Sequence, residues 1–579
     1  MKATDKKWWK KAIIYQVYPR SFKDTSGNGI GDIRGIIQKL DYIKKLGVNT
    51  IWLNPIVRSP QIDNGYDVSD YYTIDPIFGT MEDMEELIEE AHKRELNIIF
   101  DFVLNHTSIE HNWFQEALKG PDNPHRNFYI WSDALPNGDL PNNWASLFGE
   151  SVWEKEPVGD QFYFHLFKKE MPDLNWDNPH VGNAMIDIGK FWIDKGIDGF
   201  RLDAFIHLDK LDDFSREITL NNKEVISAQE INENLPNIKN YIQNLTSGLR
   251  KEKPDIFILG EAASADANLA FTYTDPKNDM CDAIISFMLF PEDHSVKDAR
   301  LPFNMQHAIL DKDEFKKTMI EWQEKLDCFG GPTLYWNNHD MPRAVSRFGD
   351  EKLFRDNSSK MLATLMYLQK GIPFIYYGEE IGMCNLRHEN PQEFETPGAV
   401  AFYAKSKALG YTEEHILKEL NSTARDVGRG VMQWDDSEFA GFSTMTPWSG
   451  VNIEEQYTVY AQEKDPISIL AYYRAVLKHK NTPIFTEGSF RMFEMKGSLY
   501  SYERVLDNQH AVVICNFSDT KERIFQTGMI DNQWQIILQN EGNCIEGNCI
   551  TLAPFGAIVL LENTLVAKKK ETDLKVKEL

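Results

Sequence analysis

The chain has 579 residues, of which 42% are hydrophobic and 12% aromatic, so it is long enough for one large domain with appendages and an ample core. Its 62 basic and 88 acidic residues give a net charge of −26, which excludes nucleic acid and anionic lipid as natural partners and favours a neutral or cationic ligand. Because no apolar run approaches the roughly 20 residues that span a bilayer, and no signal-peptide pattern occurs, we expect a cytoplasmic protein without a membrane partner.

Short runs rich in β-branched and aromatic residues recur eight times along the chain, with helical patterns between them. Strand and helix alternating eight times is the pattern of an α/β protein of the (β/α)8 barrel type, a TIM barrel. The eight predicted strands lie within residues 13–19, 50–56, 97–106, 199–205, 256–262, 283–288, 333–340 and 373–380.

Polar residues in these runs fall at or near the ends of the strands. Strands of such a barrel are covered on both faces, so charged residues are expected only where the C-terminal ends open to solvent at one mouth. Residues two apart on a strand share a face about 6.6 Å apart, so Arg201 and Asp203 both point into that mouth, where the arginine can hold the carboxylate ionised. The other polar clusters at strand ends are Asp101 with Asn105 and His106, Glu261, and His339 with Asp340.

Segments outside the eightfold alternation define further domains. The interval after the third strand is too long for one crossover helix and is rich in Trp, Asn, Pro and Phe, which predicts an inserted domain that overhangs the mouth. Alternating strands near the end predict an antiparallel β domain, followed by a charged, frayed tail. We assign 1–108 and 179–487 to the barrel, with a subdomain at about 384–460, 109–178 to the inserted domain, 488–563 to the C-terminal β domain and 564–579 to the tail.

Carboxylic acids around one pocket suit chemistry in which positive charge develops at a sugar carbon. One acid attacks, one donates and then removes a proton, and a third steadies the substrate. The alternative, that each acid is a structural ion pair or a helix cap, explains a single acid well. It does not explain four polar clusters that all lie at strand ends.

Six stretches carry a resemblance to a known family: DFVLNHTS (101–108), GFRLDAF (199–205), GEA (260–262), NNHD (337–340), MPDLNWDN (171–178) and GIPFIYYGEEIGM (371–383). Across nearly its whole length the chain resembles the α-amylase superfamily, glycoside hydrolase family 13, in its oligo-1,6-glucosidase and α-glucosidase branch. The resemblance implies a retaining hydrolase with Asp203 as nucleophile, Glu261 as acid/base and Asp340 as the third acid. It also implies that His106, Arg201 and His339 line the same subsite.

Two further stretches bear on how the substrate enters. Family members that remove single terminal glucose units carry an aspartate in a GYDxSDY stretch, matched here by Asp67 in GYDVSDY, and an arginine in RDNARTPMQW. The second stretch reads RDVGRGVMQW here, and the resemblance carries the arginine's role to Arg429. An Asp67–Arg429 pair would close the far wall of the pocket, which implies cleavage from the chain end.

Ala204, next to the implied nucleophile, bears on which linkage is cleaved. In the branch that the chain resembles, enzymes favouring α-1,6 links generally carry valine there, and those cleaving α-1,4 links carry a smaller or hydroxylated residue. Alanine leaves room for an α-1,4-linked leaving sugar, although MPDLNWDN is closer to the QPDLNW of the α-1,6 branch. We therefore expect an exo-acting α-glucosidase that cleaves terminal α-1,4 and some α-1,6 bonds of maltose and short α-gluco-oligosaccharides through a covalent intermediate, with transglucosylation as a side reaction.

Other functions stay open at this point. An oligo-1,6-glucosidase (isomaltase), a trehalose-6-phosphate hydrolase and a sucrose or trehalose isomerase share these motifs, and a phosphorylated substrate would call for an extra Lys or Arg cluster at the mouth. The non-enzymatic members of the fold that bind membrane transporters depend on a transmembrane segment and lack the catalytic acids, so they fit this chain poorly. We expect a monomer or homodimer without an organic cofactor.

The stretch DTSGNGIGD, residues 24–32, resembles compact calcium loops that alternate oxygen ligands with turn residues. It predicts one structural Ca²⁺, and the alternative is a simple glycine-rich turn. Only two of the residues are carboxylates, so binding should be weaker than in the family pattern. The candidate ligands are Asp24, Ser26, Asn28, Ile30 and Asp32.

Overall fold

The computed structural model describes residues 7–211, 226–293, 295, 297–452, 454–493, 497–525 and 534–563. Its centre is a sheet of eight parallel strands in the order β13-β12-β10-β5-β2-β1-β15-β14. The hydroxyl of Thr333 on β14 donates to the carbonyl of Ile284 on β13 at 2.8 Å, which joins the two ends of the sheet into a barrel. The strands are β1 (Ile14–Val17), β2 (Thr50–Leu53), β5 (Asn97–Val103), β10 (Gly199–Asp203), β12 (Phe257–Glu261), β13 (Ala283–Ile285), β14 (Thr333–Leu334) and β15 (Ile372–Tyr376).

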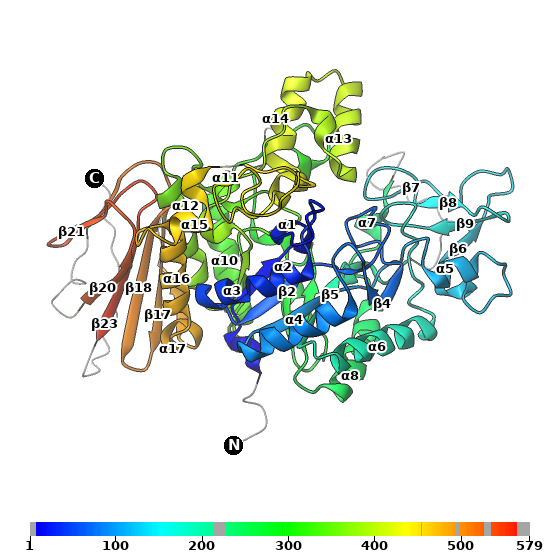
Figure 1. Ribbon diagram of the computed structural model, residues 1–579, viewed down its shortest axis with the longest axis horizontal. Helices are drawn as coiled ribbons and strands as arrows, with labels where there is room; N and C mark the ends of the chain where they lie inside the picture. Colours follow the sequence, from blue (N-terminus) through cyan, green and yellow to red (C-terminus); the bar gives the residue numbers. More distant parts are fainter. Residues whose placement is uncertain are drawn as a thin grey trace.

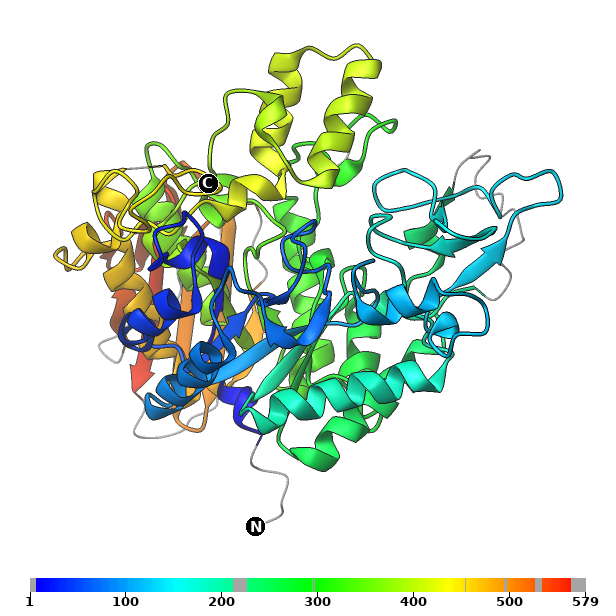
Figure 2. The ribbon, with the colours of Figure 1, turned by 45° about the vertical axis from the view of Figure 1, so that its right-hand side comes forward.

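Seven of the eight predicted runs contain one of these strands and the last overlaps β15 except for its first residue, so the predicted TIM barrel is confirmed. Helices cover the outside of the barrel (Figures 1 and 2). The helix α4 begins with a capping box between Thr80 and Asp83 and buries one apolar stripe against the strands. The helical segment after β1 is divided into two helices at Lys39. The covering helices include α2 (Ile33–Gln38), α3 (Leu40–Leu46), α4 (Met81–Lys93), α6 (Pro179–Asp194), α8 (Ile238–Glu252), α10 (Lys312–Leu326), α12 (Arg355–Tyr367) and α16 (Ile469–Lys480).

Small sheets follow the third barrel strand, in the segment predicted as an inserted domain (Figure 1, cyan). The strands β6 (Trp131–Asp133), β9 (Gln161–Phe164) and β8 (Trp153–Lys155) form an antiparallel sheet. The strand β7 (Trp144–Ala145) pairs in parallel with β11 (Ile226–Ser227), which comes from the chain beyond β10. The inserted domain therefore includes residues outside the predicted range 109–178.

A helical hairpin, α13 (Pro397–Ala408) and α14 (Glu413–Thr423), projects from the barrel on the other side of the mouth (Figure 2, yellow-green). It has a small core of its own, in which Phe402, Ile416 and Leu420 are fully buried. The chain that leaves α14 returns to the barrel mouth within a few residues, at Arg425.

Two antiparallel sheets end the described chain, and the larger of them packs against the barrel through α12 (Figure 1, orange and red). The hydroxyl of Tyr502 and the guanidinium of Arg504 donate to carbonyls at the C-terminal end of α12, which ties the domains together. Among the described residues, no helix combines the length and the apolar character that a membrane crossing requires. The sheets are β16 (Ser489–Met492), β17 (Leu499–Leu506), β18 (Gln509–Asn516), β23 (Ala557–Asn563) and β20 (Trp534–Gln539), and β19 (Glu522–Phe525), β22 (Cys549–Leu552) and β21 (Cys544–Glu546).

Candidate active site

Arg201 lies at the centre of an acidic cluster at the C-terminal ends of three adjacent strands. Its Nη1 donates to Asp101 Oδ1 on β5 at 2.8 Å and to Asp203 Oδ1 on its own strand, β10. Its Nη2 lies 2.8 Å from Glu261 Oε2 on β12. The arginine side chain is only 1% exposed. The buried strand β10 can therefore carry both Arg201 and Asp203, because the guanidinium holds one carboxylate of its own strand and one from each neighbouring strand.

The three carboxylates compete for that single cation. Burial raises the pKa of Asp203, the charges of Glu261 and Asp101 add to the rise, and Arg201 opposes it. Burial likewise raises the pKa of Asp101 to about 6, again against the effect of Arg201. Because three acids share one positive charge, the pKa values of Asp203 and Asp101 both lie above their ordinary values.

Asp340, which follows β14, forms a second charged cluster in the mouth. Its Oδ1 lies 3.3 Å from Arg425 Nη1 and 3.2 Å from Arg429 Nη2, and its Oδ2 lies 3.2 Å from His339 Nε2. Burial raises the pKa of Asp340, but His339 and the two arginines more than offset it, so the pKa lies well below its ordinary value. This carboxylate is therefore ionised at neutral pH.

His339 and Tyr66 connect the two clusters. Burial, with the nearby arginines, lowers the pKa of His339 to about 3, so its imidazole is neutral. The Tyr66 ring stacks on it with 5.5 Å between ring centroids, and the Tyr66 hydroxyl lies 2.7 Å from His339 Nε2 and donates to Asp101 Oδ2 at 3.0 Å. Gln16 Nε2 lies 2.9 Å from the other ring nitrogen. Tyr66 and Gln16 are not among the predicted site residues, although Tyr66 stands in the GYDVSDY stretch.

The ion pair that crosses the mouth differs from the predicted Asp67–Arg429 pair. Asp67 is fully buried and accepts hydrogen bonds from Ser59 Oγ and from the amides of Ile62 and Asp63, at 2.8 to 3.0 Å. It therefore ties its own loop together. The carboxylate of this loop that pairs with an arginine is Asp63, whose Oδ1 lies 2.9 Å from Arg425 Nη2. Arg429 contacts Asp340 and the carbonyl of His339.

The turn between Asp63 and Asp67 explains why Asp63, and not Asp67, pairs with an arginine. Asn64 and Gly65 adopt positive φ angles of 53° and 105°, which reverses the chain and directs Asp67 back into the loop. The predicted pair was therefore wrong: Arg425 stands in the RDVGRGVMQW stretch, whereas Asp63 lies two residues before the GYDVSDY stretch. A wall across the mouth is still present, made by Asp63 and Arg425.

His106 and the returning inserted segment line another side of the mouth. The Nε2 atom of His106 is buried without a hydrogen-bond partner, and Phe167 packs against the ring with 4.9 Å between centroids. Asp173, in the MPDLNWDN stretch, accepts from Asn105 Nδ2 at 3.0 Å and lies 3.1 Å from Lys210 Nζ. An unpaired buried ring nitrogen leaves one hydrogen-bonding position for a ligand.

Ala204 connects the two acids of the Arg201 cluster. Its φ of 44° places it in the left-handed region, and its amide donates to Glu261 Oε2 at 3.0 Å. The backbone turn after Asp203 therefore helps to fix the carboxylate of Glu261 beside it.

The predicted calcium loop is held together by its own hydrogen bonds. Burial raises the pKa of the Asp24 carboxyl, but its hydrogen bonds more than offset this and the pKa is lowered. Asp24 accepts from the amides of Gly27 and Gly29 and from the hydroxyls of Ser26 and Ser443, and Asp32 accepts from the amide and hydroxyl of Thr25 and from the amides of Ser26 and Gly35. Asn28 Oδ1 accepts from the amide of Ile30 at 2.8 Å.

These donors occupy the lone pairs that a cation would use, so the loop as it stands does not fit a bound calcium ion. In the described part of the chain, no group of three or more His, Cys, Asp or Glu side chains is arranged to hold a metal. Calcium binding stays a prediction.

If the loop binds calcium, the Tm in millimolar calcium should exceed the Tm in a chelator, because the ion binds only the folded loop. Superimposable melting curves would contradict calcium binding.

Carboxylates from neighbouring strands gather around one arginine at the mouth of the barrel, and Asp340 lies across it. This is the architecture of a sugar-cleaving enzyme. The α-amylase catalytic-domain model matches residues 16–488, and the chain belongs to this family, in its oligo-1,6-glucosidase branch. It is a glycoside hydrolase of the α-glucosidase type.

Three similar proteins illustrate the range of the branch. The oligo-1,6-glucosidase of Parageobacillus thermoglucosidasius is 40% identical, over 88% of this chain and 91% of that protein. The solved structure of the trehalose-6-phosphate hydrolase of Bacillus licheniformis matches with a TM-score of 0.87 and 38% identity, over 96% of this chain and all of that one. The trehalulose synthase MutB of Pseudomonas mesoacidophila matches with a TM-score of 0.87 and 34% identity, over 96% and 99% of the two chains.

Proposed function

We propose that the protein is an exo-acting, retaining α-glucosidase that removes single glucose units from short, unphosphorylated α-gluco-oligosaccharides, with α-1,6 links preferred over α-1,4. The observation that carries the reaction type is the contact of Asp203 and Glu261 with the two terminal nitrogens of Arg201. Two carboxylates held so close together suit a covalent mechanism, which needs about 5 to 5.5 Å between them. An inverting enzyme needs roughly 6.5 to 9.5 Å to admit a water molecule.

In the first step an Asp203 oxygen bonds to C1 of the terminal glucose as the bond from C1 to the leaving oxygen breaks. Glu261 gives its proton to that oxygen, so the leaving sugar departs as an alcohol. In the second step a water oxygen bonds to C1, its proton passes to Glu261, and the Asp203 carboxylate is released. Because C1 is inverted twice, glucose leaves in the α configuration.

Asp340, His339 and Arg429 would bind hydroxyl groups of the same glucose, as would the unpaired Nε2 of His106. Asp340 supplies a hydrogen-bond acceptor that stays ionised, and Arg429 a donor that stays charged. The Asp63–Arg425 pair supports exo action, because a substrate chain extending past the terminal glucose would have to break it.

The linkage expected from Ala204 gives way to the α-1,6 alternative. Relatives that are 38–40% identical to this chain are named oligo-1,6-glucosidases, and the MPDLNWDN stretch agrees with them. Ala204 still offers room for an α-1,4-linked leaving sugar. A clash or contact on the scale of a methyl group is worth about 1–3 kcal/mol, so the preference should be roughly 10- to 200-fold and not absolute.

In the described parts of the loops after β10 and β13, paired cations favour a neutral substrate over trehalose 6-phosphate. Among the described residues of the loops after β10 and β13, Lys210 is paired with Asp173 and Lys297 with Glu292. Glu292 also pairs with Arg347. A phosphate needs cations that are not already neutralised by carboxylates.

A substrate panel tests this proposal. We expect the kcat/KM for isomaltose to exceed that for maltose, with trehalose, sucrose and trehalose 6-phosphate far below both and glucose as the main product from isomaltose. A higher kcat/KM for trehalose 6-phosphate, or conversion of sucrose to an isomer, would move the protein to one of the neighbouring activities.

Ala204→Val should lower the kcat/KM for maltose by at least tenfold while leaving that for isomaltose within about threefold, because the two added methyl groups obstruct only the stiffer linkage. Valine is β-branched and the backbone here is left-handed, so the Tm of the variant must be measured alongside. If both rates fall together at an unchanged Tm, Ala204 does not set the linkage preference.

A further inference from the structure

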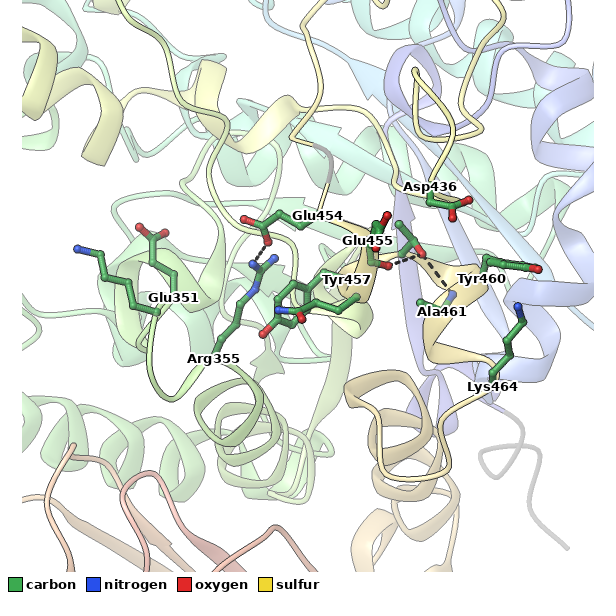
Figure 3. Close-up of a pocket in the computed structure, with 12 residues that line it drawn as sticks. Glu351, Arg355, Asp436, Glu454, Glu455, Tyr457, Tyr460, Ala461 and Lys464 are labelled. Atoms are coloured by element: carbon green, nitrogen blue, oxygen red, sulfur yellow. Dashed lines mark hydrogen bonds and ion pairs between the residues drawn. The ribbon is translucent and has the colours of Figure 1, made fainter.

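A second cavity lies away from the acidic clusters and plays no part in the proposed reaction. It has a volume of about 650 Å³, within the 300–1,000 Å³ typical of ligand sites, and is open to solvent. Its walls come from the start of α12 and from the two short helices η10 (Glu455–Tyr457) and α15 (Val459–Gln462). In Figure 3 the lining residues form a groove from Glu351 at one end, past Tyr457, to Tyr460 and Lys464 at the other. An extended shape suits a chain-like ligand.

The charges of this groove balance. Glu454 pairs with Arg355, and Glu351 pairs with Arg387 just outside the groove. The remaining lining charges are two acids and two bases: Asp436, Glu455, Lys352 and Lys464. In a protein with a net charge of −26, a groove without excess charge favours a neutral ligand, and its carboxylates and ammonium groups favour one rich in hydroxyls.

Two tyrosine rings supply flat surfaces. Tyr457 is held in place, because the Arg355 guanidinium lies 3.4 Å from its ring centroid and its hydroxyl donates to Asp356 at 3.0 Å. Tyr460 is 53% exposed, with Lys464 Nζ 3.3 Å from its ring centroid. Stacking a ligand on these rings costs little side-chain entropy, because both tyrosine rings are already held in place.

The helices that carry these rings are tied to the active-site segment. The amides of Val459 and Tyr460 donate to the carbonyls of Gln433 and Trp434, both at 2.9 Å. Gln433 and Trp434 follow Arg429 in the chain by only a few residues. The groove is therefore a fixed part of the barrel wall and not a mobile surface loop.

We propose that this groove is a second carbohydrate site, which binds several consecutive units of an α-glucan chain outside the active site. Pyranose rings combine apolar C–H faces with hydroxyl edges, which matches tyrosine rings flanked by carboxylates, amides and ammonium groups. The choice of α-glucans as the ligand rests on the proposed function, whereas a neutral, hydroxyl-rich chain follows from the groove itself. Holding such a chain here would raise the local concentration of chain ends around the enzyme.

Native gels containing dextran, soluble starch or a cellulose derivative test the proposal. The full-length Asp203→Asn variant is run with saturating glucose, so that the active site is filled and no polymer is consumed. We expect dextran or starch to retard the protein and the cellulose derivative to have no effect. Adding Tyr460→Ala or Asp436→Asn should weaken the apparent affinity at least fivefold.

Tyr72→Ala is the matched control, because Tyr72 is also a surface tyrosine, 42% exposed, on the distant strand β4 (Asp70–Ile74), and should leave retardation unchanged. In the active enzyme, Tyr460→Ala should keep the kcat/KM for isomaltose within twofold while raising the KM for dextran. Absence of retardation by either α-glucan, or equal retardation of the parent and Tyr460→Ala, would overturn the second site. If the substrate panel contradicts the proposed function while the α-glucans still retard the protein, the proposed function is overturned and the second site stands.

Discussion

Replacing Asp203 with asparagine should lower kcat for isomaltose by roughly 10⁴-fold or more, because the amide keeps the volume of the side chain but cannot form the bond to C1. The fold should survive. Burial and two neighbouring carboxylates raise the pKa of Asp203, so its ionised form is disfavoured in the folded state. A raised pKa means that the carboxylate costs stability at pH values above its unfolded pKa, and asparagine removes that cost.

The Tm of Asp203→Asn at neutral pH should therefore equal or exceed that of the parent. This measurement separates a chemical defect from a folding defect. Activity within tenfold of the parent would remove Asp203 from the nucleophile role, and inactivity with a Tm several degrees lower would leave the loss attributable to damage of the Arg201 cluster.

Glu261→Gln should have an effect that depends on the leaving group. With isomaltose, kcat should fall by about 10²- to 10⁴-fold, because the departing alcohol needs a proton. With a dinitrophenyl α-glucoside the first step needs no acid, so we expect a rapid burst of the phenol. Slow turnover should follow, since the glutamine cannot take a proton from the attacking water.

Azide provides the control for this variant. It is a nucleophile that needs no base, so it should restore turnover of the dinitrophenyl substrate and yield the α-glucosyl azide. The same variant without a burst, or without rescue by azide, would assign the acid/base role to another residue. Asp101, which also contacts Arg201, is the next carboxyl group to examine, because its pKa is raised to about 6.

The barrel and its acidic mouth could be predicted from sequence because both depend on local patterns. Each barrel strand is buried on both faces and so reads as an apolar run, and polar residues such as Asp203 and Glu261 stand out at its end. Because the strands of the barrel are parallel, these ends all meet at one mouth. The inserted segment and the C-terminal strands were recognisable for the same reason, as breaks in the alternation.

Features that depend on loop geometry could not be predicted. Asp63 and Asp67 are four residues apart in one loop, and only the turn at Asn64 and Gly65 decides which of them faces Arg425. Tyr66 looks like a core aromatic until its hydroxyl is seen to join Asp101 to His339. The pairing of β7 with β11 joins segments separated by the whole of β10, a contact that no local pattern encodes.

The central claim is that hydrolysis proceeds through a glucosyl-enzyme ester on Asp203, and the anomeric form of the first product tests it most directly. Proton NMR of isomaltose hydrolysis, recorded before mutarotation is significant, follows the glucose released from the non-reducing end. Because two displacements at C1 restore the starting configuration, we expect α-glucose to form first and β-glucose to rise only at the rate of mutarotation. Initial release of β-glucose would contradict the account, since it requires a single displacement by water and a wider separation of Asp203 and Glu261.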